Sequence, residues 1–231
     1  MSNKRYYFLS SEWGKMRDKL TKEEFEKWRK EKNNKHRREL YQRNKQIIDA
    51  HKGSRSCQCG ESNILCLEFH HRDQLDKLFN ISLGGKKTSI TRLEHEIEKC
   101  DIICKNCHTK IHNKTTQNIH ILKKKIEEIN LLLLGKLDKP ERHKLHRNKQ
   151  KYIAKLYIKD HKIKNNCEKC GENNSNCLVF HHNHKTNKEA KIPQLYKYGI
   201  KKVKKEMEKC SLLCSNCHSK SHHKSPLQSD F

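Results

Sequence analysis

Histidines recur in patterns that could bind a metal ion and move a proton. His108 and His112 lie four residues apart, so in a helix both imidazoles would face one side and could share an ion. His70 and His71 are adjacent and follow a strand-like stretch, residues 67–69. Neighbours in a strand point to opposite faces. We therefore expect one histidine of this pair to bind metal and the other to accept a proton.

Twelve cysteines lie beside these histidines in two windows. Two cysteine pairs can supply the four thiolates of a structural zinc site, and a small module with few apolar residues needs one to stay folded. The expected quartets are Cys57, Cys59, Cys104 and Cys107, and Cys167, Cys170, Cys214 and Cys217. Only one residue separates the first pair of the first quartet, which is tighter than usual. The remaining cysteines, expected to be small buried apolar side chains, are Cys66, Cys100, Cys177 and Cys210.

The two windows are copies of one another. When the chain is shifted along itself by a fixed number of residues, Cys59 and the first His-His pair coincide with Cys170 and a second His-His pair. The later cysteines and histidines of the two windows coincide at a shift that is one residue shorter. One residue has therefore been lost between the two blocks. The histidines of the second window are His181, His182, His218 and His222. This register predicts a tandem duplication, with copies over about residues 57–113 and 167–223.

The composition favours a nucleic-acid partner. The chain of 231 residues carries 52 Lys+Arg against 27 Asp+Glu, a net charge of +25, and only 32% of it is hydrophobic, too little for one large core. The basic residues are spread along the chain, and none of its segments has the aromatic underside of a basic membrane-binding helix. There is no apolar run of about 18 residues and no signal-peptide core near the N-terminus. We expect an intracellular protein, in cytoplasm, nucleus or virion, that is neither secreted nor membrane-bound.

Helices are expected around the two copies. Residues 11–50 are basic and contain a capping box, Thr21 to Glu24. Apolar residues at helical spacing predict a helix over 119–134, and another is expected from about Glu141 to Asp160. The predicted organisation is a basic helical N-terminal segment (1–52), a first module (53–115), a helical linker (116–163), a second module (164–223) and a tail (224–231).

The sequence resembles a known family of nucleases. The resemblance rests on the motifs Leu-Glu-Phe-His-His-Arg-Asp at 67–73 and Glu-Ile-Glu-Lys-Cys-Asp-Ile-Ile-Cys-Lys-Asn-Cys-His at 96–108, and on His112 after them. These are similar to the HNH endonucleases, in particular the zinc-ribbon-containing subgroup of phages, large DNA viruses and mobile elements. The resemblance covers the two copies, which make up roughly half of the chain.

The resemblance implies an α+β fold with two tandem ββα-metal (His-Me finger) modules, each with a structural zinc. It implies that the general bases are His71 and His182. The implied ligands of a catalytic Mg²⁺ or other divalent cation are His70 with His108, His112 or both in the first copy. In the second copy they are His181, His218 and His222. The implied activity is hydrolysis of DNA phosphodiester bonds, one strand per module, by a chain that could act as a monomer. The substrate would be duplex DNA, with no small-molecule cofactor and no membrane.

The sequence departs from the family at two points. Lys99 and Lys209 stand where the family usually has its middle asparagine, so Asn106 and Asn216 are candidates for the orienting role. The second copy also differs directly after its His-His pair, and it could be a degenerate module kept for DNA binding. Two other hypotheses stay open: a zinc-dependent nucleic-acid-binding protein with one or both nuclease modules inactive, and a disulfide-bonded secreted toxin.

Overall fold

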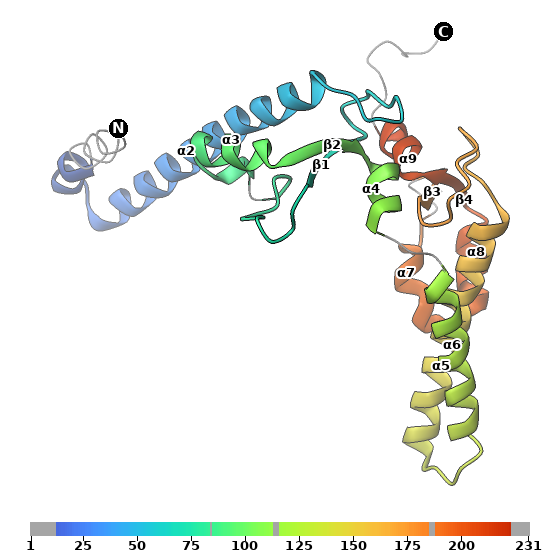
Figure 1. Cartoon of the computed structure of the whole chain (residues 1–231). Coiled ribbons are helices and arrows are strands. Elements are labelled where there is room, and N and C mark those ends of the chain that lie inside the picture. Colours follow the sequence, from blue (N-terminus) through green and yellow to red (C-terminus); the bar gives the residue numbers. More distant parts are fainter. Residues whose placement is uncertain (1–12, 84, 113–115, 185–187, 223–231) are drawn as a thin grey trace. The chain divides into compact units, whose positions relative to one another are not determined.

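The computed structural model describes residues 13–83, 85–112, 116–184 and 188–222 (Figure 1). It is an α+β structure whose strands form two-stranded sheets. The chain divides into two compact units, the first made of residues 1–54 and 71–101 and the second of residues 55–70 and 102–231. The predicted tail, 224–231, and the N-terminal residues examined for a signal peptide, 1–9, lie outside the described residues.

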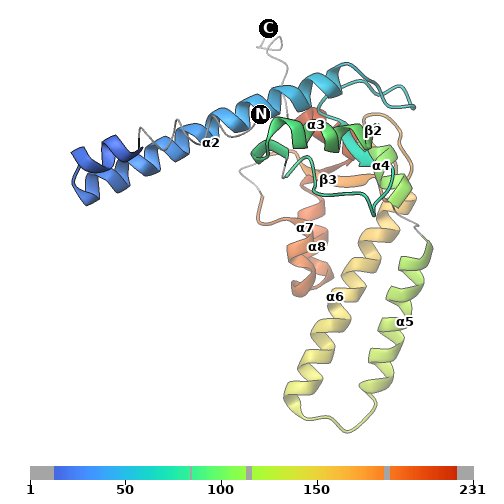
Figure 2. The ribbon, with the colours of Figure 1, turned by 60° about the vertical axis from the view of Figure 1, so that its left-hand side comes forward.

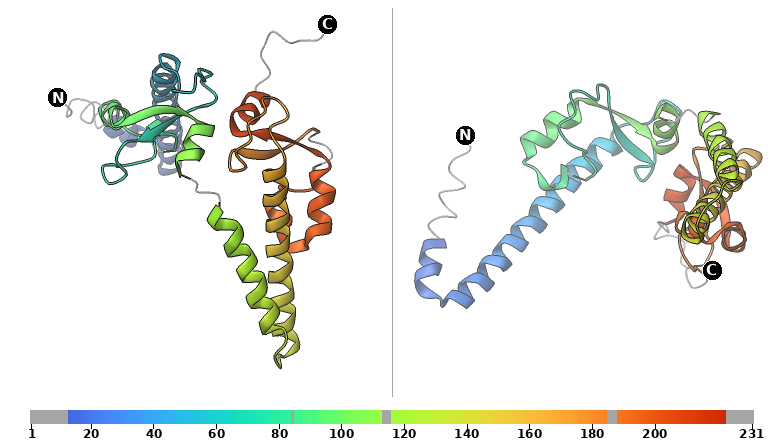
Figure 3. Two further views of the ribbon diagram at one scale, coloured as in Figure 1. Left: turned by 45° about the vertical axis from the view of Figure 1, so that its right-hand side comes forward. Right: turned by 90° about the horizontal axis from the view of Figure 1, so that it is seen from below.

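The first unit is built on the long helix α2 (Lys22–Gly53), drawn in blue in Figure 3. Its predicted capping box is present, since Thr21 Oγ1 accepts from the Glu24 backbone N–H at 3.3 Å and the Glu24 carboxylate accepts from the Thr21 N–H at 2.9 Å. Near its other end, Asn44 is fully buried, and its side-chain amide donates to the backbone carbonyls of Gly85 and Thr88. The basic helix is therefore a packed part of this unit.

The short helix η1 (Gly85–Lys87) and helix α3 (Ile90–Glu98) complete the first unit. The Asn44 side chain donates to the Gly85 carbonyl at 2.8 Å. A Cβ at Gly85 would lie 2.9 Å from Leu93 Cδ1, so any other residue here would require the Leu93 side chain to shift. Ser89 caps α3, and its buried face includes Leu93 and Glu96.

The second unit contains most of the strands. Strands β1 (Leu67–His71) and β2 (Cys100–Cys104) form one sheet, and β3 (Leu178–His182) and β4 (Cys210–Cys214) form another. The second pair is antiparallel, with Phe180 opposite Leu212. Helix α4 (Lys105–His112) begins directly after β2, and α9 (Ser215–Ser221) begins directly after β4.

Two further helices form an antiparallel hairpin between the copies, α5 (Thr116–Leu132) and α6 (Lys139–Lys164), as Figure 2 shows. Both were predicted from the sequence. The second starts two residues earlier than expected because Asp138 caps it, accepting from the Glu141 N–H at 2.7 Å, with Pro140 in the first turn.

The inner face of α6 belongs to the core of the second copy. Ala154 and Ile158 are buried against three short helices that follow β3, namely α7 (Ile192–Leu195), η2 (Tyr196–Tyr198) and α8 (Ile200–Met207). These two residues precede Cys167 by the same spacings as the buried Asn44 and Ile48 of α2 precede Cys57. Each copy therefore includes a long preceding helix, whereas the predicted organisation set these helices apart as an N-terminal segment and a linker.

No helix among the described residues is long and apolar enough to cross a membrane.

Candidate metal centres

Each copy gathers the four sulfurs of a predicted quartet, which lie within 4.8 Å of one another. The Sγ atoms of Cys59 and Cys104 are 3.6 Å apart, and those of Cys170 and Cys214 are also 3.6 Å apart. Thiolates that each stand about 2.3 Å from one tetrahedral ion are about 3.8 Å from one another. Both clusters could therefore hold a structural zinc ion.

The tight first pair of the first quartet is accommodated by a shorter loop. The Cys57 N–H donates to the Glu61 carbonyl at 2.9 Å, and the Cys167 N–H donates to the Glu172 carbonyl at the same distance. The loop of the first copy closes through Gly60, whose φ of 89° is in the left-handed region that favours glycine. Cys57 thus takes the place of Cys167 in a loop that is one residue shorter.

Backbone groups around the first cysteine of each quartet favour its thiolate. Burial acts to raise the pKa of Cys57, but the N–H groups of Cys59 and Cys104 point at its sulfur and the pKa falls to about 7. Burial also acts to raise the pKa of Cys167, but backbone N–H groups including that of Cys214 outweigh it and the pKa falls to about 7. The thiolate is the form that binds metal, so these loops are suited to a metal ion.

Three histidines converge in the first copy. His70 comes from β1, and His108 and His112 come from successive turns of α4, as their spacing predicted. The ring centroids are 5.2 Å (His70–His108), 5.1 Å (His70–His112) and 4.9 Å (His108–His112) apart. One nitrogen of each ring lies within 4.8 Å of the others, an arrangement that could hold a metal ion.

The second copy repeats this cluster with His181, His218 and His222. The centroids are 5.2, 5.0 and 4.5 Å apart, and the Nε2 atoms of His218 and His222 approach to 3.2 Å. Burial, together with the charges of His222 and His181, lowers the pKa of His218 to about 4. His218 is therefore neutral at physiological pH, which is the state in which imidazole binds metal.

The two clusters differ in what supports them. In the first copy the Glu68 carboxylate is 2.8 Å from Nδ1 of His108. A carboxylate on one ring nitrogen fixes the tautomer and directs Nε2 to a metal. At the equivalent strand position the second copy has Val179, which can make no such bond.

The second histidine of each His-His pair contacts a buried glutamate. In the first unit, Nε2 of His71 lies 2.8 Å from Oε1 of Glu96, and both side chains are buried. The same oxygen accepts the backbone N–H groups of Leu78 and Phe79 at 2.8 and 3.2 Å. Burial would raise the pKa of Glu96, but these hydrogen bonds, with the nearby Lys99 ammonium, lower it. Glu96 is thus a fixed anion.

The second unit holds the same arrangement around His182. Its Nε2 lies 2.8 Å from Oε1 of Glu206, which also accepts the N–H groups of Glu189 and Ala190. Burial opposes ionisation of Glu206, but bonds from Lys209, His182 and those amides lower its pKa to about 2.

The sequence carried a signal for these glutamates that was missed. Glu96 precedes Cys100 by the same spacing as Glu206 precedes Cys210, and these two cysteines match in the repeat. The glutamates are therefore part of the duplicated pattern.

Asn106 and Asn216, the candidates for the orienting role, lie elsewhere. Each is buried, and each accepts the backbone N–H of the other through its side-chain oxygen at 3.3 Å. The side chains bonded to His71 and His182 are Glu96 and Glu206, 25 and 24 residues further along the chain. The asparagines therefore join the two copies, and the glutamates contact the second histidine of each pair.

The four cysteines outside the quartets are neutral hydrogen-bond donors. Cys66, Cys100 and Cys177 are buried and Cys210 is half-buried, and burial raises the pKa of each thiol to about 11. They therefore remain protonated thiols. Each thiol donates a hydrogen bond to a backbone carbonyl, a polar contact that the prediction of small buried apolar side chains did not include.

No model of a known protein family matches the chain, and neither a curated protein nor a solved structure does. Its function is therefore inferred from its own residues and their geometry.

Proposed function

We propose that the chain is a metal-dependent endonuclease of the HNH type, which hydrolyses phosphodiester bonds of duplex DNA at two ββα-metal centres. One observation carries the proposal. In each copy the first histidine of a His-His pair joins a three-histidine cluster, while the second is bonded to a buried, ionised glutamate. In both copies two strands pair into a sheet and the second strand is followed at once by a helix, which supports the ββα assignment.

The three-histidine clusters fit a catalytic cation. Imidazole ligands suit a first-row transition ion better than Mg²⁺, which prefers oxygen ligands. In this proposal the ligands are His70, His108 and His112 in one centre and His181, His218 and His222 in the other. A bound cation would stabilise the negative charge that develops on the phosphate and on the leaving 3′-oxygen.

The glutamate-bound histidine of each copy is suited to accept a proton. Because Glu206 takes the Nε2–H of His182, the lone pair of the imidazole is on Nδ1. Nδ1 can then take a proton from the attacking water, and the Glu206 carboxylate stabilises the imidazolium that forms. Glu96 accepts the Nε2–H of His71 in the same way, which leaves the lone pair of that ring on Nδ1.

The charge of the chain supports a DNA substrate. Helix α6 alone carries ten Lys and Arg against two acidic residues. Basic residues that neutralise backbone phosphates supply most of the affinity of proteins for DNA, independently of its sequence. A net charge of +25 fits such a partner.

The test is nicking of supercoiled plasmid by the full chain, in EDTA and with Mn²⁺, Zn²⁺ or Mg²⁺ added. We expect nicked and linear products with a divalent ion and none in EDTA. The matched control is the double variant His71→Ala/His182→Ala, which keeps every proposed metal ligand and should bind DNA without cutting it. Equal cutting by this variant would exclude the two histidines as bases. Tight DNA binding by the parent without cutting in any ion would favour the zinc-dependent nucleic-acid-binding protein instead.

A further inference from the structure

The contacts between the two copies are reciprocal. Helices α4 and α9 lie side by side in the second unit (Figure 1). The Asn106 N–H donates to Oδ1 of Asn216, and the Asn216 N–H donates to Oδ1 of Asn106, both at 3.3 Å. Cys66 Sγ contacts the Asn216 carbonyl at 3.4 Å, and Cys177 Sγ contacts the Asn106 carbonyl at 3.4 Å.

Charged groups at the rim of this interface follow the same rule. Lys110 of the first copy pairs with Glu172 of the second at 2.7 Å, and Lys220 of the second pairs with Glu61 of the first at 2.7 Å. An interface in which residue i contacts j′ and j contacts i′ is the mark of a two-fold axis. Such an axis therefore passes between the two asparagines, inside a single chain.

We propose that this internal two-fold axis presents the two histidine clusters to the two strands of one DNA duplex in equivalent positions. The strands of a duplex are antiparallel and are themselves related by local two-fold axes, which is why symmetric dimers bind symmetric sites. The inference rests on the proposed function and adds its substrate geometry: a double-strand break with a fixed stagger. The interface sets that stagger, and the α5–α6 hairpin between the copies does not.

Amide hydrogen exchange on the full chain tests the interface without using activity. Asn216→Ala removes the acceptor of the Asn106 N–H, so exchange of the residue 106 amide should quicken about fivefold, the worth of one hydrogen bond. Asn106→Ala should have the converse effect on the residue 216 amide. The control Asn173→Ala, at an exposed position of the second copy, should change neither. Unaltered exchange in both interface variants would overturn the two-fold contact, and zinc content measured alongside reveals a variant that has simply unfolded.

Mapping the cut position on each strand of labelled duplexes tests whether the double-strand break has a fixed stagger. Inserting four Gly/Ser residues within 134–138, the turn of the hairpin, should leave the stagger unchanged. The charge reversal Glu172→Lys with Glu61→Lys should scatter the stagger while single nicks persist, and adding Lys110→Glu with Lys220→Glu should restore it. A stagger that follows the insertion would overturn the proposal. A parent that makes no cuts would refute the nuclease function, and the exchange result would still decide the interface.

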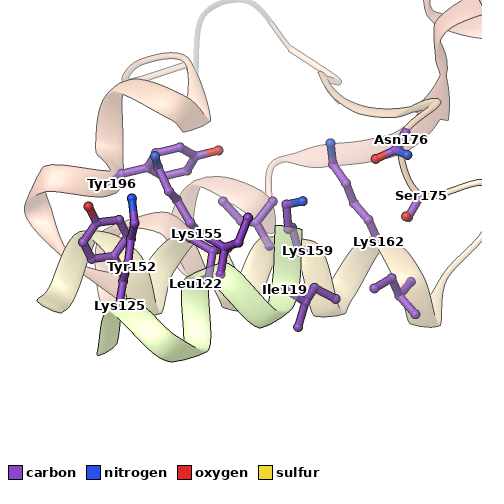
Figure 4. Close-up of a pocket in the computed structure, with 13 residues that line it drawn as sticks. Ile119, Leu122, Lys125, Tyr152, Lys155, Lys159, Lys162, Ser175, Asn176 and Tyr196 are labelled. Atoms are coloured by element: carbon purple, nitrogen blue, oxygen red, sulfur yellow. The ribbon is translucent and has the colours of Figure 1, made fainter. Parts of the chain in front are cut away.

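A second feature is a cavity of about 490 Å³ beside the α5–α6 hairpin of the second unit. Figure 4 shows the lysines that line it, with their amino groups on the side of the hairpin where Tyr196 and Asn176 lie. The four lysines come from both helices and are Lys125, Lys155, Lys159 and Lys162. The lining includes no acidic residue.

These lysines lack a countercharge among the described residues. The Lys155 ammonium lies 5.9 Å from the ring centres of Tyr152 and Tyr196, contacts that position it without neutralising it. Burial lowers the pKa of Lys159 and of Lys162, and for Lys162 the charge of Lys159 adds to the effect. Crowded, partly desolvated ammonium groups would be relieved by an anion.

The geometry assigns this cavity as a binding site for backbone phosphates of nucleic acid. Three of the lysines lie on one face of α6 at spacings of four and three residues, so their ammonium groups line one edge that a phosphate chain could follow. Helix α5 packs along α6 and supplies the fourth lysine, Lys125. The hairpin thus holds all four positive charges around one opening.

The test compares two triple variants that lose the same charge. Lys155→Gln/Lys159→Gln/Lys162→Gln should weaken binding of a 20-base-pair duplex at least tenfold more than Lys139→Gln/Lys144→Gln/Lys151→Gln, which alters exposed residues of the same helix. Equal losses would show that only overall charge matters and would overturn the site. If inorganic phosphate at millimolar concentration saturates the cavity and displaces no DNA, the cavity is a small-anion site and the proposal fails.

Discussion

Nδ1 of His108 lies 2.8 Å from the Glu68 carboxylate, and this bond has no counterpart in the second copy, where Val179 stands in place of the glutamate. A carboxylate behind a ligand histidine raises the basicity of the ring and fixes its orientation, which typically strengthens metal binding about 10- to 100-fold. The two histidine clusters are therefore unequal, although their ring geometry is nearly the same.

The first prediction concerns this difference. Glu68→Val should lower the affinity of the first cluster for Mn²⁺ about tenfold or more, toward that of the second cluster. The electron paramagnetic resonance signal of free Mn²⁺ measures binding directly and is independent of cleavage. Glu94→Val, at an exposed position of α3, is the control and should not alter the affinity. An unchanged titration of Glu68→Val would show that the carboxylate does not support the metal.

The second prediction separates the two centres. His71→Ala should leave a nickase for one DNA strand and His182→Ala a nickase for the other, because each base serves one phosphate. Strand-specific end labels on a short duplex identify which strand is cut. If His182→Ala cuts both strands as well as the parent does, the second copy is a zinc-containing DNA clamp without catalysis.

The third prediction concerns zinc. Cys217→Ser leaves one quartet with three thiolates, so the second copy should lose its zinc and unfold, because its small core depends on the metal. The first quartet should retain one zinc per chain, measured by metal analysis of the purified protein. Cys177→Ser, which alters a cysteine outside the quartets, should keep both ions. Freshly purified parent without tightly bound zinc would refute the structural role of both clusters.

The fourth prediction concerns salt. Lys35, Arg37 and Arg38 are exposed on α2. Changing them to Gln should lower the dependence of log K on log salt by up to about 0.9 for each phosphate that is no longer neutralised. Substitution is a sharper test than deleting residues 1–52, because that deletion would remove buried Asn44 and Ile48 from the first unit. An unchanged slope would show that this part of α2 does not touch DNA.

The fifth prediction follows from Glu206, whose pKa of about 2 is below the value of about 4.3 expected for an unfolded chain. A lowered carboxyl pKa stabilises the fold above about pH 4.3, and this stabilisation is lost as the pH falls toward 2. Glu206→Gln should therefore be less stable than the parent at pH 7, with the difference narrowing below about pH 4. Denaturant unfolding of both proteins at each pH measures it, and zinc loss in acid affects both alike. A difference that does not vary with pH would contradict the assigned ionisation.

The amino-acid sequence was enough to predict the duplication, both cysteine quartets and the paired histidines of α4. These features are local: zinc chemistry fixes the residue types, and a helix brings positions four apart to one side. The capping box of α2 is equally local, since Thr21 and Glu24 are three residues apart. The structure brings together every member of these predicted sets.

The side chains that support those groups, and the part to which each long helix belongs, became clear from the packing of the folded chain. The Glu96 carboxylate is held beside His71 by a loop between the two residues, whose backbone N–H groups donate to the carboxylate oxygen that His71 contacts. No local sequence pattern specifies that loop. The long helices join the copies through a few buried positions, among them Asn44 and Ala154, that look unremarkable in a basic sequence. Asn106 and Asn216 are far apart along the chain, and their reciprocal bonds form only when two folded copies meet. Such contacts depend on packing between distant segments, so spacing along the chain does not reveal them.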